Sequence, residues 1–440
     1  MDSLPSPALA GSALPIVTSK GEGEAVAADA IVDRRSGLAV AVAVIVANVS
    51  NYGFQVVTGR LLTVNEYGLL AGFMSAITII AVSTSSLQTA AAKAVAVGEN
   101  HPERREYLDK LTRTAMVGAL LFGLAVAAVA PLISRFFKIG LVPVFFLGAY
   151  AMPSSLDSIA AGRLQGAKRF RALAIYSAGQ AIAKLSLASI LILAGLRIGG
   201  LIAGLALSSA AIALWGMTAS REVGAITTHV LGPDVRRGFF AFLLLWVVVS
   251  IDLALARAFF SPHDAGVYAA AAVLGKAVLW LPAVVTQLVF PHLAERSANN
   301  EQSHSLLQKA IVVILTMSGS AVLGLYLVGG PVFSLLYGSR YDGASNIAWK
   351  IGLAMLPLTV VNLLLFHFIA QGANRFLIWM IFGAAGEAVA LCLVPKNGTS
   401  YAITIGAAGL VVLLMMTPAG GWTRIGKISG RHRPQPFSPS

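Results

Sequence analysis

The sequence predicts an all-α polytopic membrane protein of about twelve transmembrane helices, arranged as two parallel repeats of six helices each. Three observations support this fold class: the composition, a series of apolar stretches of membrane-spanning length, and an internal repeat. Hydrophobic residues make up 57% of the 440 residues and charged residues only 12%, and the mean hydropathy is +0.78. A soluble domain usually has about a quarter of its residues charged. So little charge cannot cover a water-facing surface of this size.

The apolar stretches each have about the length that a bilayer requires. A membrane-spanning helix needs roughly 20 apolar residues, because its backbone polar groups have to be satisfied within the segment. The expected helices of the first lobe, residues 37–218, cover 37–58, 68–95, 114–134, 139–161, 172–194 and 198–218. Those of the second lobe, residues 238–418, cover 238–259, 267–291, 309–329, 346–370, 375–393 and 400–417. Residues 219–237 form the loop between the lobes.

Lys and Arg are distributed unequally between the two sides of the predicted bundle. The tails and the loops after even-numbered helices hold about 21 of them, and the opposite loops hold about six. Because cytoplasmic loops retain these residues, both termini are predicted to lie in the cytoplasm of a multi-pass protein of the inner (cytoplasmic) membrane. The tails, residues 1–36 and 419–440, contain no apolar run of spanning length and are expected to be disordered.

The net charge of +13 does not indicate a nucleic-acid partner. The cations are spread over short loops beside the membrane and do not gather on one soluble module, so topology and contact with anionic membrane lipids account for them. The single cysteine, Cys392, lies within an expected helix, and a chain with one cysteine has no intramolecular disulfide.

An internal repeat divides the chain into two similar halves. The segment Gln165-Gly-Ala-Lys-Arg-Phe170 recurs as Gln371-Gly-Ala-Asn-Arg-Phe376, with five of six residues identical. Upstream, residues 131–137 align with 331–337, and residues 65–69 align with 264–267, at offsets of 200 and about 198. Each unit contains six spans, so the second copy enters the membrane from the same side as the first. The halves are therefore predicted to be parallel repeats with a substrate path between them.

The repeat motifs, together with Arg60-Leu-Leu-Thr-Val-Asn-Glu-Tyr-Gly-Leu-Leu70, Gly266-Val-Tyr-Ala-Ala270 and Phe290-Pro-His-Leu-Ala294, resemble a known family. The chain resembles, over about residues 37–393, the bacterial oligosaccharide (O-antigen and surface polysaccharide) flippases of the multidrug/oligosaccharidyl-lipid/polysaccharide exporter superfamily. The resemblance implies V-shaped, MATE-like lobes that move an undecaprenyl-pyrophosphate-linked oligosaccharide from the inner to the outer leaflet by alternating access. It also implies surface or extracellular polysaccharide synthesis, with the polysaccharide polymerase and glycosyltransferases as partners.

Polar side chains within the spans follow helical stripes, which favours a cavity between the lobes. A charge near the bilayer centre costs at least about 2.5–3.5 kcal/mol, so such residues normally face a protein interior or a wet cavity. Lysines suit a pyrophosphate, and amides and an aromatic ring suit a sugar. The predicted substrate-binding residues on these stripes are Asn48, Asn51, Gln55, Gln180, Lys184, Lys276, Trp280 and Gln287.

Other titratable groups in the spans have two interpretations. Asp252 either takes part in transport or forms an ion pair, with Lys276 or Lys184 as the partner. Glu387 and His367 either carry a coupling proton or are packing residues. Asp157, near the end of its span, is interpreted as an interface residue.

Motifs for enzymatic chemistry are absent from the sequence. It contains no G-x-x-x-x-G-K-[ST] loop and no Cys/His cluster with metal spacing, so we expect no catalytic residue, cofactor or metal. Two alternatives to the flippase remain. One is a cation-coupled multidrug or small-molecule antiporter of the same superfamily, whose members use an acidic residue in the first lobe, whereas the first helix here has no carboxylate. The other is a membrane scaffold or an unrelated carrier.

Overall fold

A computed structural model describes residues 20–96, 103–220, 233–282, 304–370 and 375–416. The helices of the first lobe are α1 (Lys20–Leu61), α2 (Val64–Ala96), α3 (Glu103–Ala128), α4 (Ala130–Phe137), α5 (Leu141–Gly166), α6 (Phe170–Leu191) and α7 (Arg197–Ala219). Those of the second are α8 (Pro233–Phe259), α9 (Pro262–Trp280), α11 (His304–Tyr337), α12 (Ala344–Ala370), α13 (Arg375–Leu393) and α14 (Gly398–Met416). Two short turns, η1 (Ile192–Leu196) and η2 (Ser339–Tyr341), complete the described elements.

The helical membrane fold is confirmed. Each of the twelve expected spans overlaps a helix of the structure, although residues 283–291 of the eighth lie outside the described residues. Ten stretches in the described residues are long and apolar enough to cross a membrane, and one of them, Phe170–Ala219, contains both α6 and α7. The chain breaks between these two helices at Gly195, whose φ of +88° is accessible to glycine without strain.

Several helix boundaries differ from the approximate ones expected, and two of these differences have a local cause. Helix α1 begins at Lys20, so residues 20–36 are helical and not a disordered tail. This segment includes four alanines and two glutamates, which are strong helix formers, and it has no proline. The expected span 114–134 is divided into α3 and α4 by Val129, with Pro131 in the first turn of α4. Proline has no N–H to bond to the preceding turn, so it ends one helix and begins the next.

The two lobes repeat the same packing scheme. In the first lobe α5 packs against α2, α3 and α7, while α6 packs against α1 and α7. In the second, α12 packs against α9, α11 and α14, while α13 packs against α8 and α14. The helix pairs are the same when α1, α2 and α3 are matched with α8, α9 and α11, and α5, α6 and α7 with α12, α13 and α14. The duplication seen in the sequence is therefore a duplication of structure.

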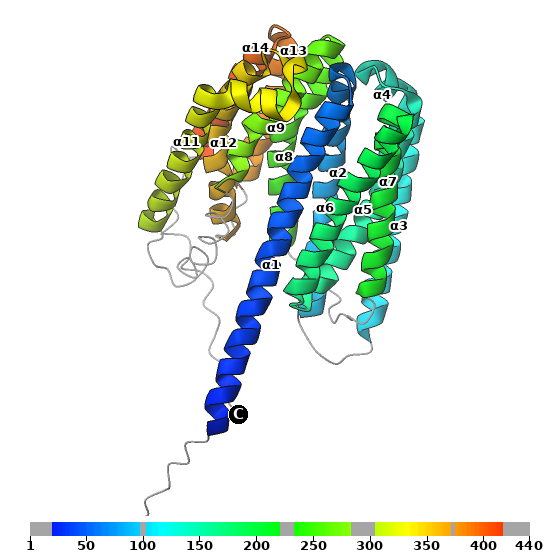
Figure 1. Ribbon diagram of the computed structural model, residues 1–440, viewed down its shortest axis with the longest axis vertical. Helices are drawn as coiled ribbons and strands as arrows, with labels where there is room; N and C mark the ends of the chain where they lie inside the picture. Colours follow the sequence, from blue (N-terminus) through cyan, green and yellow to red (C-terminus); the bar gives the residue numbers. More distant parts are fainter. Residues whose placement is uncertain (1–19, 97–102, 221–232, 283–303, 371–374, 417–440) are drawn as a thin grey trace, which may run out of the picture.

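The lobes stand side by side in Figure 1, with α11 and α12 on one side and α3, α5 and α7 on the other. Helix α2 makes the main contact between them, because it packs along both α8 and α9. We call the end of the bundle that holds the turns 62–63, 138–140, 260–261 and 394–397 the turn end, and the opposite end, which holds residues 167–169, the basic end. In Figure 1 the lobes lie close together at the turn end and α11 diverges from α3 and α7 toward the basic end.

Polar and aromatic contacts join the lobes at the turn end. Arg60, at the end of α1, donates from Nε to the backbone oxygen of Leu336 at 2.8 Å. In return, Arg340 donates to the backbone oxygen of Arg60 at 2.7 Å. The rings of Tyr67 and Tyr341 meet edge to face with centres 5.7 Å apart. These contacts hold the lobes together at this end in the conformation described.

Candidate functional site

Lys184 on α6 faces the polar stripe of α1. Its Nζ donates a hydrogen bond to Oδ1 of Asn51 and stands 5.1 Å from the centre of the Phe54 ring. No ion pair within the described part of the chain involves Lys184. A cation in the middle of a span is thus compensated only by an amide and an aromatic face, both of which are neutral. This arrangement leaves its charge available to an anion.

The rest of the polar stripe on α6 faces another helix. The Tyr176 hydroxyl and Nε2 of Gln180, the latter at 2.6 Å, both donate to the carboxylate of Asp157 on α5. The ring of Trp215 on α7 stacks on Tyr176, with centres 5.4 Å apart. The predicted stripe is therefore divided between two partners, and Gln180 stabilises a partly buried carboxylate in this conformation. Sequence reasoning gave Asp157 no site role, although its charge within a span was the signal for one.

The second lobe contains a buried ion pair between Asp252 on α8 and Lys276 on α9. Their Oδ1 and Nζ atoms are 2.6 Å apart. Nζ also donates to the backbone oxygen of Val249 at 2.6 Å, and the Tyr268 hydroxyl donates to Oδ2 of Asp252 at 2.6 Å. The Asp252 side chain is completely buried. Every oxygen of this carboxylate is thus satisfied, as a charge in a low-dielectric interior requires.

The position of Lys276 bears on the expected shared cavity. Only 8% of the residue is exposed, so in this conformation it does not line an open space together with Lys184. The ion-pair alternative is the arrangement observed, because α8 and α9 are consecutive helices that bring the two charges within reach. A role for Lys276 in binding a head group stays a prediction. Tyr268, which the sequence analysis did not single out, completes the cluster.

Glu387 on α13 is a second buried carboxyl beside this pair. It is 1% exposed, and neither of its oxygens has a hydrogen-bond partner among the described residues. It lies within electrostatic range of both Asp252 and Lys276, and it lines a groove of about 380 Å³ between α13 and α14. Two carboxyl groups and one ammonium are neutral together only when one carboxyl carries a proton. The cluster can therefore hold one exchangeable proton.

The remaining predicted site residues are scattered. Asn48 lies exposed on α1, and Gln55 accepts a hydrogen bond of 3.4 Å from the Tyr67 hydroxyl near the seam between the lobes. His367 is buried on α12, with its ring centre 5.8 Å from that of Phe368. Two members of the predicted set cannot be placed: the side chain of Trp280 and the whole of Gln287 lie outside the described residues.

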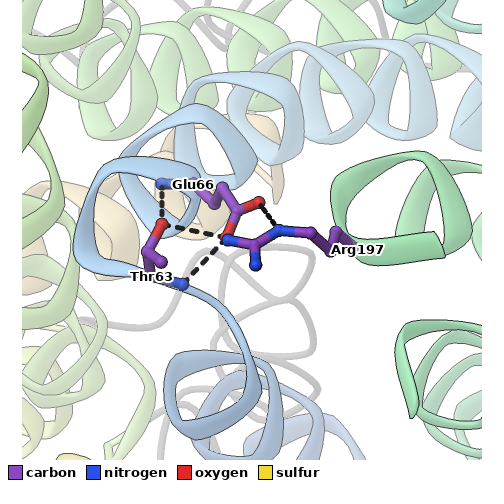
Figure 2. Close-up of polar contacts among 3 residues, drawn as sticks. All are labelled: Thr63, Glu66 and Arg197. Carbon is purple, nitrogen blue, oxygen red and sulfur yellow. Dashed lines mark hydrogen bonds and ion pairs between the residues drawn. The ribbon is translucent and has the colours of Figure 1, made fainter. Parts of the chain in front are cut away.

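A polar cluster at the turn end sets the start of α2, as Figure 2 shows. Thr63 and Glu66 form a capping box: the Glu66 carboxylate accepts from the Thr63 backbone N–H at 2.9 Å, and the Thr63 hydroxyl oxygen accepts from the Glu66 N–H at 3.3 Å. Arg197 adds two parallel hydrogen bonds of 2.8 and 2.9 Å to the same carboxylate. Ser261 and Asp264 repeat the hydroxyl-to-N–H cap on α9, 198 residues later.

Comparisons with known proteins agree with this architecture. Residues 57–346, more than half of the chain, match the family described as "Polysaccharide biosynthesis protein". No curated protein matches the chain. A structure of the lipid II flippase MurJ in an inward closed conformation is 14% identical and has a TM-score of 0.68, with 86% of each chain covered.

Two further structures with the same fold are multidrug or related transporters. An inward-facing MATE family multidrug resistance transporter of the MOP superfamily is 14% identical, with a TM-score of 0.62 and coverage of 84% of this chain and 93% of that one. A MOP superfamily transporter from Pyrococcus furiosus is 14% identical, with a TM-score of 0.57 and coverage of 87% and 93%. At this identity, the likeness establishes the fold alone.

Proposed function

Because the chain belongs to the family of polysaccharide biosynthesis proteins, we propose that it is a flippase that moves a lipid-pyrophosphate-linked oligosaccharide across the cytoplasmic membrane. The observation that carries this proposal is Lys184. Its ammonium lies in the middle of a span, bonded to the neutral amide of Asn51, and no acidic side chain in the described residues pairs with it. A transporter of anionic head groups needs a cation of this kind.

The chemistry around Lys184 fits both parts of such a substrate. The ammonium attracts a pyrophosphate from several directions, because it is a compact charge on a flexible stem and demands no single geometry. Asn48 and Asn51 project from the same side of α1, one turn apart, and both are exposed. Their amides can donate to and accept from sugar hydroxyls. The lipid tail can remain in the bilayer while the head group crosses.

Alternating access requires the lobes to close at one end while they separate at the other. The contacts of Arg60, Arg340, Tyr67 and Tyr341 close the turn end in the conformation described. With the termini and the basic loops in the cytoplasm, the turn end faces outward and this conformation would admit substrate from the inside. Release would then require these contacts to break.

The second lobe supplies a candidate for coupling to a gradient. Glu387 has no bonding partner in the described residues and lies beside Asp252 and Lys276. Gain or loss of a proton there changes the charge that is buried between α8, α9 and α13, and so the relative stability of different lobe conformations. In this proposal glycosyltransferases act on the glycan before the flippase does, and a polysaccharide polymerase acts on it afterwards.

Deletion of the gene, followed by analysis of surface polysaccharide and of lipid-linked intermediates, tests the function. We expect glycan to be lost and lipid-linked intermediates to accumulate inside. Complementation with Lys184→Ala should fail at normal membrane abundance, and Lys184→Arg should restore more export than Lys184→Gln because the charge is what matters. Lys350→Gln is the control, since Lys350 lies at the turn end of α12 and bonds Thr399. Normal export by Lys184→Gln would exclude this lysine as the head-group ligand.

One observation favours the second candidate, a cation-coupled antiporter. Asp157 is a carboxylate in the first lobe that is held by Tyr176 and Gln180, with no cationic partner in the described residues. If this function is correct, deletion leaves the glycan unchanged and alters drug sensitivity, and Asp157→Asn has the same effect as the deletion. The flippase proposal instead requires the glycan defect.

A further inference from the structure

Arg257 is a buried cation whose charge has no partner in the described structure. It lies in the last turn of α8 at the turn end and is 6% exposed. Its Nη2 donates to the backbone oxygen of Lys138 at 2.9 Å, but Nε and Nη1 are both buried without any acceptor among the described residues. A buried guanidinium with two unused nitrogens is costly unless an anion satisfies them.

The surroundings of Arg257 are otherwise apolar. The side chain borders a slot of about 150 Å³ at the seam between the lobes, lined by α2, α4 and α5 of the first lobe and by α8 of the second. The lining includes Phe73, Ile133, Phe137 and Leu147. The only other side chain in the lining with a polar group is Ser75, and its hydroxyl already donates to the backbone oxygen of Ser250 at 2.6 Å. Nothing in the lining neutralises the guanidinium.

The chain makes room for this arginine. A Cβ at Gly72 of α2 would lie 3.2 and 3.3 Å from Cβ and Cγ of Arg257, so the absence of a side chain there accommodates the stem. On the other side, the end of α4 presents the Lys138 carbonyl to the guanidinium. Residues of the first lobe therefore fix this side chain of the second lobe beside the slot.

We propose that the slot binds the phosphate of an anionic membrane phospholipid, with Arg257 as its ligand. A guanidinium presents N–H groups in the fork geometry that matches a phosphate, and its pair is strong in a water-excluded site. The hydrocarbon attached to the phosphate covers the apolar lining, which a free hydrated anion does not. Arg257 lies in the last turn of α8, two residues before the end of the apolar stretch Phe240–Phe259, where a spanning helix approaches the head groups.

This site is separate from the proposed transport site and does not depend on it. Because its lining comes from both lobes, a bound phosphate connects α2 and α4 to α8. The lipid is then a stabiliser of the conformation in which the turn end is closed, and its affinity differs between that conformation and one in which the lobes separate there.

Native mass spectrometry of the purified, delipidated full chain tests the proposal by titration with phosphatidylglycerol. We expect the affinity for the first lipid bound to be at least about tenfold lower in Arg257→Gln, since it loses charge-assisted hydrogen bonds. Arg257→Lys should be intermediate. The matched control is Arg135→Gln, which removes an exposed arginine from α4 at the same end and should bind as the wild type does.

Two further measurements, one with a second variant and one with other ligands, identify the source of the anion and control for misfolding of Arg257→Gln. Ala254→Leu fills the slot from α8 while it retains Arg257, and it should also abolish the first binding event if the slot holds the lipid. Diacylglycerol, which has the acyl chains but no phosphate, should bind without dependence on Arg257. Equal binding of phosphatidylglycerol to the wild type, Arg257→Gln and Ala254→Leu would overturn the proposal, and so would displacement of the lipid by millimolar inorganic phosphate.

Discussion

The backbones of Gly68 in α2 and Gly266 in α9 lie in direct contact at the seam between the lobes. A Cβ on Gly68 would come 2.7 Å from the amide nitrogen of Gly266, and a Cβ on Gly266 would collide with the carbonyl of Val64. The two glycines are 198 residues apart, the same offset that relates the capping residues Thr63 and Ser261. Equivalent positions of the two repeats therefore meet each other where the lobes close.

Gly68→Ala should separate α2 from α9 at the turn end. The methyl group has no space, so we expect a loss of about 1–3 kcal/mol in the free energy of unfolding, as for other overpacked sites. Thermal unfolding in detergent measures the effect. Gly118→Ala on α3 is the control, because nothing lies within 4 Å of a Cβ there; alanine is the better helix former and should be neutral or stabilising. Equal melting temperatures for the two variants would contradict the close packing.

Lys276→Gln should destabilise the second lobe more than the loss of a surface charge does. Removal of one partner of a buried pair costs about 3–5 kcal/mol, because the carboxylate of Asp252 would remain buried without its cation. The double variant Lys276→Gln, Asp252→Asn should recover much of the lost membrane abundance. Abundance and thermal stability measured across the double-mutant cycle give the coupling energy. A cycle in which the two losses simply add would show that the pair is not the source of the stability.

Thr63→Ala should cost more stability than Arg197→Ala, although the arginine makes two hydrogen bonds. The Arg197 side chain is 62% exposed, so water and salt compensate for most of its ion pair with Glu66. Loss of the Thr63 hydroxyl leaves the N–H of Glu66, in the first turn of α2, without its acceptor, at a cost of about 1 kcal/mol. Melting temperatures at low and high salt separate the two effects. Only the Arg197 contribution should decrease as salt rises.

The predicted orientation can be tested by thiol labelling in intact cells. Cys392 is exposed, so Cys392→Ser has to be the background for single cysteines. Lys168→Cys should be protected from a membrane-impermeant reagent, whereas Lys396→Cys should react, because the two exposed positions lie at opposite ends of the bundle. Labelling of Lys168→Cys from outside would reverse the assignment of the basic end to the cytoplasm.

The twelve spans could be predicted from the sequence because lipid imposes a local rule. Each helix has to satisfy the hydrogen bonds of its own backbone and present an apolar surface. About 20 consecutive residues are therefore enough to predict it. Local rules also explain where the prediction was wrong. The segment after Lys20 contains good helix formers, including four alanines, without being apolar, and Pro131 divides a stretch whose apolar character is continuous.

The partners of the polar residues were much harder to predict than their positions. Helical spacing placed Tyr176, Gln180 and Lys184 on one face of α6, but the face meets two helices. Its first two members bind Asp157 of α5, and Lys184 binds Asn51 of α1. Spacing along one helix specifies a direction, and only the packing of the neighbours specifies what lies in that direction.

The sequence by itself determined the membrane class, the number of spans and the duplication, since each of these depends on residues that are adjacent or regularly spaced in the chain. The tertiary structure alone decided how the charges are used. In the described part of the chain, Lys276 is paired with Asp252, Lys184 has only neutral partners, and Arg257 is buried beside an apolar slot. All three are cations within apolar spans, so the sequence does not distinguish their roles. Their difference comes from which helices approach them, because in a low-dielectric interior the free energy of a charge depends on the groups within a few ångströms of it.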